Sequence, residues 1–152
     1  MNYFEEAVAA MKQLYSKDIP MSLATVRGGK PNARFVDLYF DGASSYLVTT
    51  RTSQKCEEIK ENPMVALNYQ LFVAHGVAYD IGSPLNHPEL REVLRKEFAP
   101  WYAKHVDENN PDTCIIKIAL TDAIVFLNGM KYKVDFSRQE AAREPFAVDI
   151  IF

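Results

Sequence analysis

The sequence predicts a mainly β protein in which antiparallel strands form a β-barrel with flanking helices. About eight short segments show the alternating or β-branched pattern of strands. Short turn signals separate most of these segments, and helical periodicity is confined to three others. Antiparallel strands joined by short turns close naturally into a barrel, with helices packed at its ends or gaps.

The first element is expected to be a helix over residues 2–16, because Phe4, Val8, Met11 and Leu14 form one apolar stripe. The pair Ile19-Pro20 ends that region, since the residue before a proline avoids helical geometry. The pattern then changes from helical to extended, and the strands are expected at residues 21–26, 33–40, 45–50, 64–71, 72–81, 114–120, 124–128 and 131–136.

Two further helices interrupt the strands. The shorter one is expected at residues 54–61, with Ser53 as a suitable N-cap and Asn62-Pro63 as its end. The longer one begins at Pro88 and is expected to run to about residue 104. The whole chain, residues 1–152, is expected to form one domain with its core over 21–136. In the tail 137–152, the apolar segment 146–152 is expected to dock on the rest.

Composition excludes several classes of function. The net charge of −3 argues against a protein that coats nucleic acid, because such binding needs an excess of Lys and Arg. No segment approaches the ~18 consecutive apolar residues of a membrane span, and the start lacks the pattern of a secretory signal. Cys56 and Cys114 lie far apart in no metal-binding spacing. We therefore expect a cytoplasmic protein with two reduced thiols and no metal site.

The segment after the third strand carries the strongest signal for a ligand. Thr50, Thr52 and Ser53 precede the helix that begins near Lys55. Helix N-termini bind phosphate readily because their amides are free and their dipole end is positive. Arg34, one strand back, could reach the same anion with two N–H groups at once. The same residues also have an ordinary interpretation, since Ser and Thr are common helix caps.

Several pieces of this region occur in a recognisable order. They are Leu23-Ala24-Thr25-Val26, the glycine turn 28–31, Arg34, the strand 46–50, Ser53-Gln54-Lys55 and Asn62-Pro63-Met64-Val65. Their order and spacing over residues 21–67 resemble the flavin-binding split barrel of the pyridoxamine 5′-phosphate oxidase-like family. The likeness is greatest to its small members of the general stress protein 26 type, and a looser likeness extends to Phe136.

The resemblance implies an FMN-binding split β-barrel of Greek-key-like topology that binds FMN at the interface of a homodimer. It implies that Arg34 and Lys55 neutralise the FMN phosphate, while the second and third strands flank the isoalloxazine ring and the ribityl chain. The implied cofactor-binding residues are Arg34, Phe35, Val36, Asp37, Val48, Thr49, Thr50, Ser53, Gln54 and Lys55. The expected activity is that of a flavin-dependent oxidoreductase, in which the flavin carries the electrons. The sequence identifies no catalytic residue, substrate or electron donor.

Departures from the family's true oxidases argue against the oxidation of pyridoxamine phosphate. Tyr39 stands where those enzymes carry a lysine. The segment 126–133 keeps a glycine but lacks the Arg-x-His element that holds the substrate phosphate, and Leu127 replaces an aromatic ring. We therefore expect another small-molecule substrate, and the alternative is a flavin-binding carrier or sensor in the stress response without turnover.

Three single residues have two interpretations each. His75 could ligate haem in a split barrel that binds haem or a deazaflavin instead of FMN, although a strand histidine with a hydrogen-bonded ring is the commoner case. Trp101, with Tyr102 beside it, could stack near a partner's flavin, although packing is the more common role of such an aromatic pair at the end of a helix. Asp37 has no second carboxylate or histidine placed beside it by the sequence, so we expect it to position backbone or lie at the surface.

Overall fold

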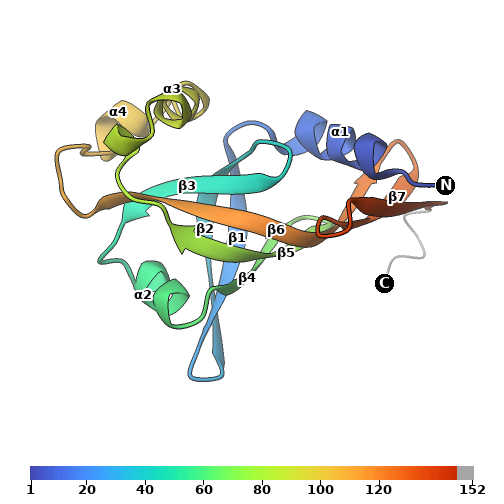
Figure 1. The fold of residues 1–152 in the computed structure, drawn as a ribbon, viewed down its shortest axis with the longest axis horizontal. Coiled ribbons are helices and arrows are strands. Elements are labelled where there is room, and N and C mark those ends of the chain that lie inside the picture. The colour runs from blue at the N-terminus through green and yellow to red at the C-terminus, as the bar shows by residue number, and fades with distance from the viewer. Residues whose placement is uncertain (147–152) are drawn as a thin grey trace.

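The computed structural model describes residues 1–146, and a six-stranded antiparallel barrel forms its centre (Figure 1). The strands follow the order β3-β2-β1-β4-β5-β6, and β3 also pairs with β6, which closes the ring. Their bounds are β1 Ile19–Arg27, β2 Lys30–Phe40, β3 Ser44–Thr50, β4 Met64–Tyr69, β5 Phe72–Asp80 and β6 Thr113–Leu127. The mainly β class and the barrel predicted from the sequence are confirmed.

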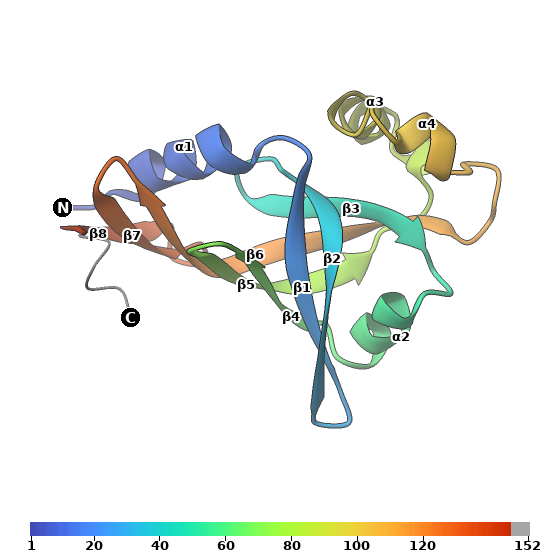
Figure 2. The same ribbon diagram turned by 180° about the vertical axis from the view of Figure 1, so that it is seen from behind.

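Two more strands, β7 (Met130–Asp135) and β8 (Glu140–Pro145), extend the sheet from β6 beyond the ring. The helix α1 (Phe4–Tyr15) lies near this extension and contacts β2, β6, β7 and β8. Figure 2 shows α3 (Pro88–Glu97) and α4 (Tyr102–His105) together above β3, after the short helix η1 (Pro84–Asn86). The helix α2 (Gln54–Glu61) lies on the other side of the same end of the barrel and contacts β1 and β5.

The strands differ from the expected ones after residue 110. The two strands expected at 114–120 and 124–128 form one continuous strand, β6, because an irregularity in the β5 pairing at His75/Gly76 absorbs the extra residue at Thr121. The strand β8 lies in the expected tail, where alternation is weak. Residues 147–152, most of the segment expected to dock, lie outside the described part of the chain.

The helix expected at 88–104 is also divided. The helix α3 ends at Glu97, and α4 resumes only at Tyr102. Pro100 lies in this interval, and a proline both lacks an N–H donor and disfavours helical geometry in the residue before it. Phe98 and Tyr102, on either side of the interruption, are both buried in one cluster with Tyr46 of β3 and Ile115 of β6.

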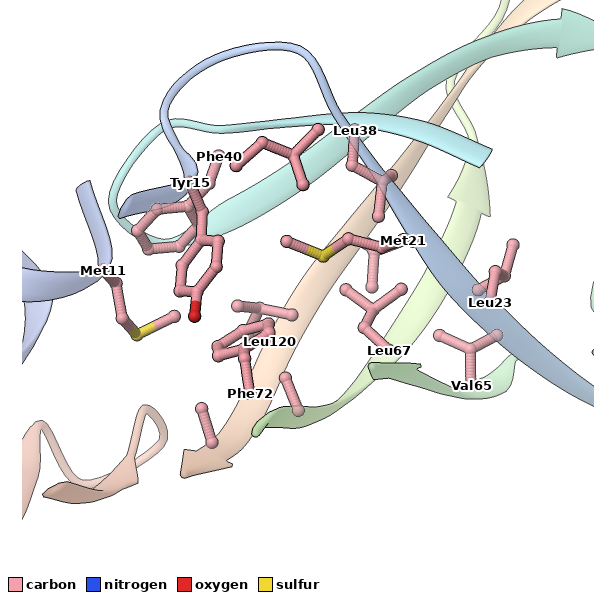
Figure 3. Close-up of a cluster of buried hydrophobic side chains, with 14 of the residues drawn as sticks. Met11, Tyr15, Met21, Leu23, Leu38, Phe40, Val65, Leu67, Phe72 and Leu120 are labelled. Carbon is pink, nitrogen blue, oxygen red and sulfur yellow. The ribbon is translucent and has the colours of Figure 1, made fainter. Parts of the chain in front are cut away.

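The barrel interior is filled by alternate strand residues, as a period of two requires. Ile19, Met21 and Leu23 of β1 all point inward and are buried. Figure 3 shows how Met21 and Leu23 meet side chains of neighbouring strands, with Met11 and Tyr15 of α1 covering one end. The inward series of β1 continues at Thr25, which is a fully buried polar residue at the end covered by α2. A polar group in that position needs a hydrogen-bond partner, and α2 supplies it.

No helix in residues 1–146 is long and apolar enough to cross a membrane.

Candidate functional site

The strands β2 and β3 separate near the α2 end of the barrel. They pair only at Tyr39–Tyr46 and Phe40–Ser45, close to their connecting turn. Beyond that point β2 pairs only with β1 and β3 only with β6, among the described residues. The residues Phe35–Asp37 of β2 and Val48–Thr50 of β3 are therefore on strand edges that do not pair with each other. All six residues were expected at a cofactor site, and they border one gap in the barrel wall.

Arg34 is held in place by a buried carboxylate. Its guanidinium donates from Nη2 to Glu58 Oε1 at 3.2 Å, and from Nη1 to Thr25 Oγ1 at 2.8 Å and to the Leu23 carbonyl at 3.2 Å. Three of its five N–H donors are thus engaged. The remaining two have no partner within residues 1–146 and are available to another acceptor.

Glu58 is fully buried and connects three elements. Its Oε2 accepts hydrogen bonds from Thr25 Oγ1 at 2.7 Å and from Asn32 Nδ2 at 3.0 Å. These bonds, with the positive charge of Arg34, lower the pKa of the Glu58 carboxyl below its usual range despite its burial. Glu58 and Asn32 were not predicted as site residues, and Thr25 was noted only as part of a motif. Glu58 is two residues from Cys56 and adjacent to Ile59, so helical periodicity does not place it on their face. Its burial follows from its contacts with Thr25 of β1 and Asn32 of β2.

Lys55 lies half-buried in the first turn of α2. Burial lowers the pKa of its ammonium group, and the charge of Arg34 lowers it further, so the two cations lie close enough to repel each other. Among the described carboxylates, none lies within salt-bridge distance of Lys55. Glu58 forms an ion pair with Arg34 only, and the Cys56 sulfur in the same turn raises the pKa of Lys55 in opposition to Arg34. Lys55 is thus a cation without a carboxylate partner among the described residues at this helix end.

The cap of α2 also lacks partners. The Ser53 side chain makes no capping hydrogen bond, and its buried hydroxyl has no hydrogen-bond partner among the described residues. The first amides of a helix have no acceptor within the helix itself. Gln54, the next residue, is exposed. An anion at this helix end would supply the acceptors that Ser53 and the first-turn amides lack.

Val48, Thr49 and Thr50 line one wall of a cavity of about 340 Å³, and Trp101 and His105 lie on the other. The Thr50 and Thr52 hydroxyls lie 3.1 Å apart. Trp101 donates from its indole nitrogen to Asp18 Oδ2 at 2.8 Å, and its ring stacks on Phe98. Trp101 therefore packs against Phe98 of the helical segment and also lines the cavity beside the edge of β3.

Asp37 has a carboxylate neighbour after all. Burial, together with a hydrogen bond to Asp18 and the charge of Asp18, raises the pKa of the Asp37 carboxyl to about 6. The other oxygen of Asp18, Oδ1, is buried without a donor among the described residues, so a proton held by Asp37 would satisfy it. The sequence places no carboxylate beside Asp37, because Asp18 lies ahead of β1 and only the β1–β2 pairing brings it near.

His75 has the hydrogen-bonded ring of an ordinary strand histidine. Its Nδ1 lies 2.8 Å from Asp122 Oδ1, and its side chain is about half exposed. An axial haem ligand needs an apolar enclosure for the macrocycle, which this position does not provide. Within residues 1–146, no group of three or more His, Cys, Asp or Glu side chains is arranged to hold a metal ion.

Comparison with known proteins identifies one matching family and one relative of similar sequence. The family model described as pyridoxamine 5′-phosphate oxidase matches residues 7–125. The general stress protein 26 of Bacillus subtilis (strain 168) is 46% identical over 44 residues, which is 29% of this chain and 31% of that protein. The chain therefore matches less than a third of the length of this relative.

Two solved structures share the fold. The general stress protein 26 from Bacillus anthracis str. Sterne superposes with a TM-score of 0.60 at 20% identity, over 78% of this chain and 92% of that one. The pyridoxamine 5′-phosphate oxidase-related, FMN binding protein from Nostoc punctiforme PCC 73102 gives 0.57 at 16% identity, over 95% and 97%.

Proposed function

The chain belongs to the pyridoxamine 5′-phosphate oxidase family, and on that premise we propose that it binds FMN and acts as a flavin-dependent oxidoreductase. The observation that carries the proposal is the unsatisfied helix end at Ser53 and Lys55, next to Arg34. These residues fit a phosphate monoester, which offers several acceptors and two negative charges. The Nostoc punctiforme relative, described as FMN binding, supports the choice of flavin.

In this proposal each group of residues has a separate task. Arg34, Lys55, Ser53 and Gln54 hold the phosphate, and Glu58 fixes the direction of the Arg34 guanidinium. The unpaired edges of β2 and β3 offer backbone donors and acceptors to the ring system, and the Thr49 and Thr50 side chains face the ribityl chain. The flavin, when bound, supplies the electron chemistry, and the protein supplies orientation and electrostatics.

The proposal includes a homodimer. Phe35 lies next to Arg34 on β2, and its side chain is 81% exposed. A large aromatic ring so exposed at the edge of a binding site is a typical interface residue. A second copy of the chain would cover it and complete the site around the ring.

Oxidation of pyridoxamine phosphate is not part of the proposal. The segment 126–133 forms the end of β6, the turn at Asn128-Gly129 and the start of β7, and it carries no Arg-x-His element. We propose a different small-molecule substrate. A flavin-binding carrier without turnover is the second candidate. The missing Arg-x-His element is the one that holds the substrate phosphate in the family's oxidases, so the chain lacks that contact with a substrate.

The test begins with the visible absorption spectrum of freshly purified protein. The apoprotein is then titrated with FMN, and binding is monitored by the fluorescence of the flavin. The expected result is flavin absorption bands, or saturable binding that raises the melting temperature. Rapid reduction of the bound flavin by NADH or NADPH, followed by transfer to an acceptor, would support the oxidoreductase over the carrier. Protein that is colourless and unaffected by FMN contradicts both.

A further inference from the structure

A cavity of about 630 Å³ lies between α2, the end of β5 and the start of β6. None of the residues that line it belongs to the proposed flavin site or to the proposed dimer contact at Phe35. Its volume is within the range of roughly 300–1,000 Å³ that is typical of small-molecule sites. Its lining combines buried apolar side chains with charged groups at the rim, so it has the composition of such a site as well as the size.

The helix α2 separates this cavity from the proposed phosphate site. Lys60 lines the cavity, whereas Glu58 is fully buried and its Oε1 lies 3.2 Å from Arg34. A helix turns by about 100° per residue, so Lys60 and Glu58, two residues apart, point in nearly opposite directions. A molecule in the cavity would therefore contact the face of α2 that does not hold Arg34.

The floor of the cavity is apolar. Ile59 of α2, Ala78 of β5 and Ile116 of β6 line it, and all three are buried. Tyr79 also lines the cavity, but this residue is 50% exposed. An exposed aromatic ring beside an apolar hollow offers a surface on which another ring can stack. The floor and this ring together favour a ligand with a planar apolar body.

The charged groups at the rim include one cation without a partner. Asp80 accepts a hydrogen bond from Arg51 Nε at 2.6 Å, so these two charges compensate each other. Glu57 lies 3.8 Å from Arg27. No carboxylate of residues 1–146 lies within salt-bridge distance of the Lys60 ammonium group. The rim therefore favours a ligand that carries a negative charge.

We propose that this cavity is a second ligand site, which binds an aromatic acid, a planar apolar ring system that carries one carboxylate. The ring system lies on the floor formed by Ile59, Ala78 and Ile116 and stacks on Tyr79, and the carboxylate faces the Lys60 ammonium group. The site is independent of the flavin proposal, because it consists only of groups on this face of α2 and on the adjoining strands.

The test is isothermal titration calorimetry of the full chain with 2-naphthoate, first without FMN and then with saturating FMN. We expect saturable binding with the same affinity in both titrations. The uncharged analogue 2-naphthamide should bind roughly tenfold more weakly, because it lacks the charge-assisted contact. Absence of saturable 2-naphthoate binding, equal affinity for the amide, or displacement of 2-naphthoate by FMN would overturn the proposal. If FMN itself does not bind, the flavin proposal fails, while the first titration still tests this site.

Two variants test the location of the site. Tyr79→Ser should weaken 2-naphthoate binding roughly tenfold. Its matched control is Leu85→Ser, a residue of similar exposure (51%) that does not line the cavity, and this variant should bind like the wild type. Lys60→Gln should weaken the binding of 2-naphthoate but not of 2-naphthamide, and it keeps the test available if Tyr79→Ser has a lowered melting temperature. Wild-type affinity for 2-naphthoate in Lys60→Gln or in folded Tyr79→Ser, or an equal loss in Leu85→Ser, would overturn the proposal.

Discussion

The Arg34 guanidinium lies 3.2 Å from the Glu58 carboxylate, and this contact ties β2 to α2 across the end of the barrel. Glu58 is fully buried, whereas the Arg34 side chain is 24% exposed. The guanidinium is therefore anchored to the protein interior, and its charge is near enough to Lys55 in the first turn of α2 to lower the pKa of that side chain. A buried carboxylate thus orients a cation toward the place where the flavin phosphate is proposed to bind.

Loss of the buried carboxylate should destabilise the fold. Glu58→Leu removes the acceptor of Thr25, Asn32 and Arg34, and a buried donor without a partner is costly. We expect the melting temperature to fall by several degrees in differential scanning calorimetry. The matched control is Glu57→Leu, an exposed carboxylate on the same helix. An equal fall in both variants would show that the buried network contributes nothing of its own.

Neutralising Asp37 should stabilise the protein at neutral pH. Its pKa is raised from 3.8 to about 6 in the folded state, so folding takes up a proton between these values. The resulting stability is fully present below pH 3.8 and is lost as the pH rises through about 6.

Asp37→Asn should therefore be more stable than the wild type at pH 7, by on the order of 1 kcal/mol after allowance for solvent screening. Its melting temperature should also depend less on pH between 4 and 7. Thermal scans across that range measure both effects, with Glu140→Gln, an exposed carboxylate, as the control. A lower melting temperature for Asp37→Asn at pH 7 would contradict the raised pKa.

A methyl group at Gly76 should be poorly tolerated. Its Cβ would lie 2.7 Å from the Ile118 Cγ2 and 2.8 Å from the Ala119 carbonyl oxygen, at the point where the β5–β6 register shifts. We expect Gly76→Ala to lower the free energy of unfolding by about 1–3 kcal/mol in urea titration. Gly28→Asn is the control, because that turn has no neighbour within 4 Å and asparagine tolerates its φ of +57°. Equal stability of the two variants would mean that the barrel relaxes at Gly76.

Phe35→Ser should dissociate the proposed dimer without unfolding the chain. The ring is 81% exposed, so its removal costs the isolated chain little, whereas an interface would lose a large apolar contact. Sedimentation velocity should show a dimer for the wild type and a monomer for Phe35→Ser. Leu85→Ser, at 51% exposure in η1, should remain a dimer. A wild-type monomer, or a Phe35→Ser dimer of unchanged affinity, argues against this interface.

The sequence predicted the parts of the fold that depend on local patterns. Period-two alternation located β1, β2 and β3, and the Ser53 and Asn62-Pro63 signals bounded α2. Alternation failed at Thr121-Asp122, where two polar residues indicated a break but a change of register in β5 keeps β6 continuous. That compensation comes from the partner strand, which local periodicity does not describe.

In the candidate site too, features that depend on local sequence were predicted, whereas contacts between distant segments were not. Arg34, Ser53 and Lys55 were predicted because a helix start and a nearby cation are visible in the sequence. The contacts of Glu58 with Arg34 and of Asp18 with Asp37 were not predicted. Each joins residues on different segments of the chain, and their proximity depends on how the strands pair and the barrel closes.

The start of α2 is proposed to bind the flavin phosphate, and a comparison of two ligands tests this assignment. The dissociation constants of FMN and of riboflavin, which lacks the phosphate, would be measured by fluorescence for the wild type, Lys55→Gln and Lys60→Gln. Loss of one charge-assisted phosphate contact corresponds to about 1.5–3 kcal/mol, or roughly 10- to 150-fold in affinity. We predict that Lys55→Gln weakens the binding of FMN by this factor and leaves the affinity for riboflavin unchanged. Lys60→Gln, on the exposed end of the same helix, should change neither affinity. Unchanged FMN affinity in Lys55→Gln, or an equal loss for both ligands, would contradict the account.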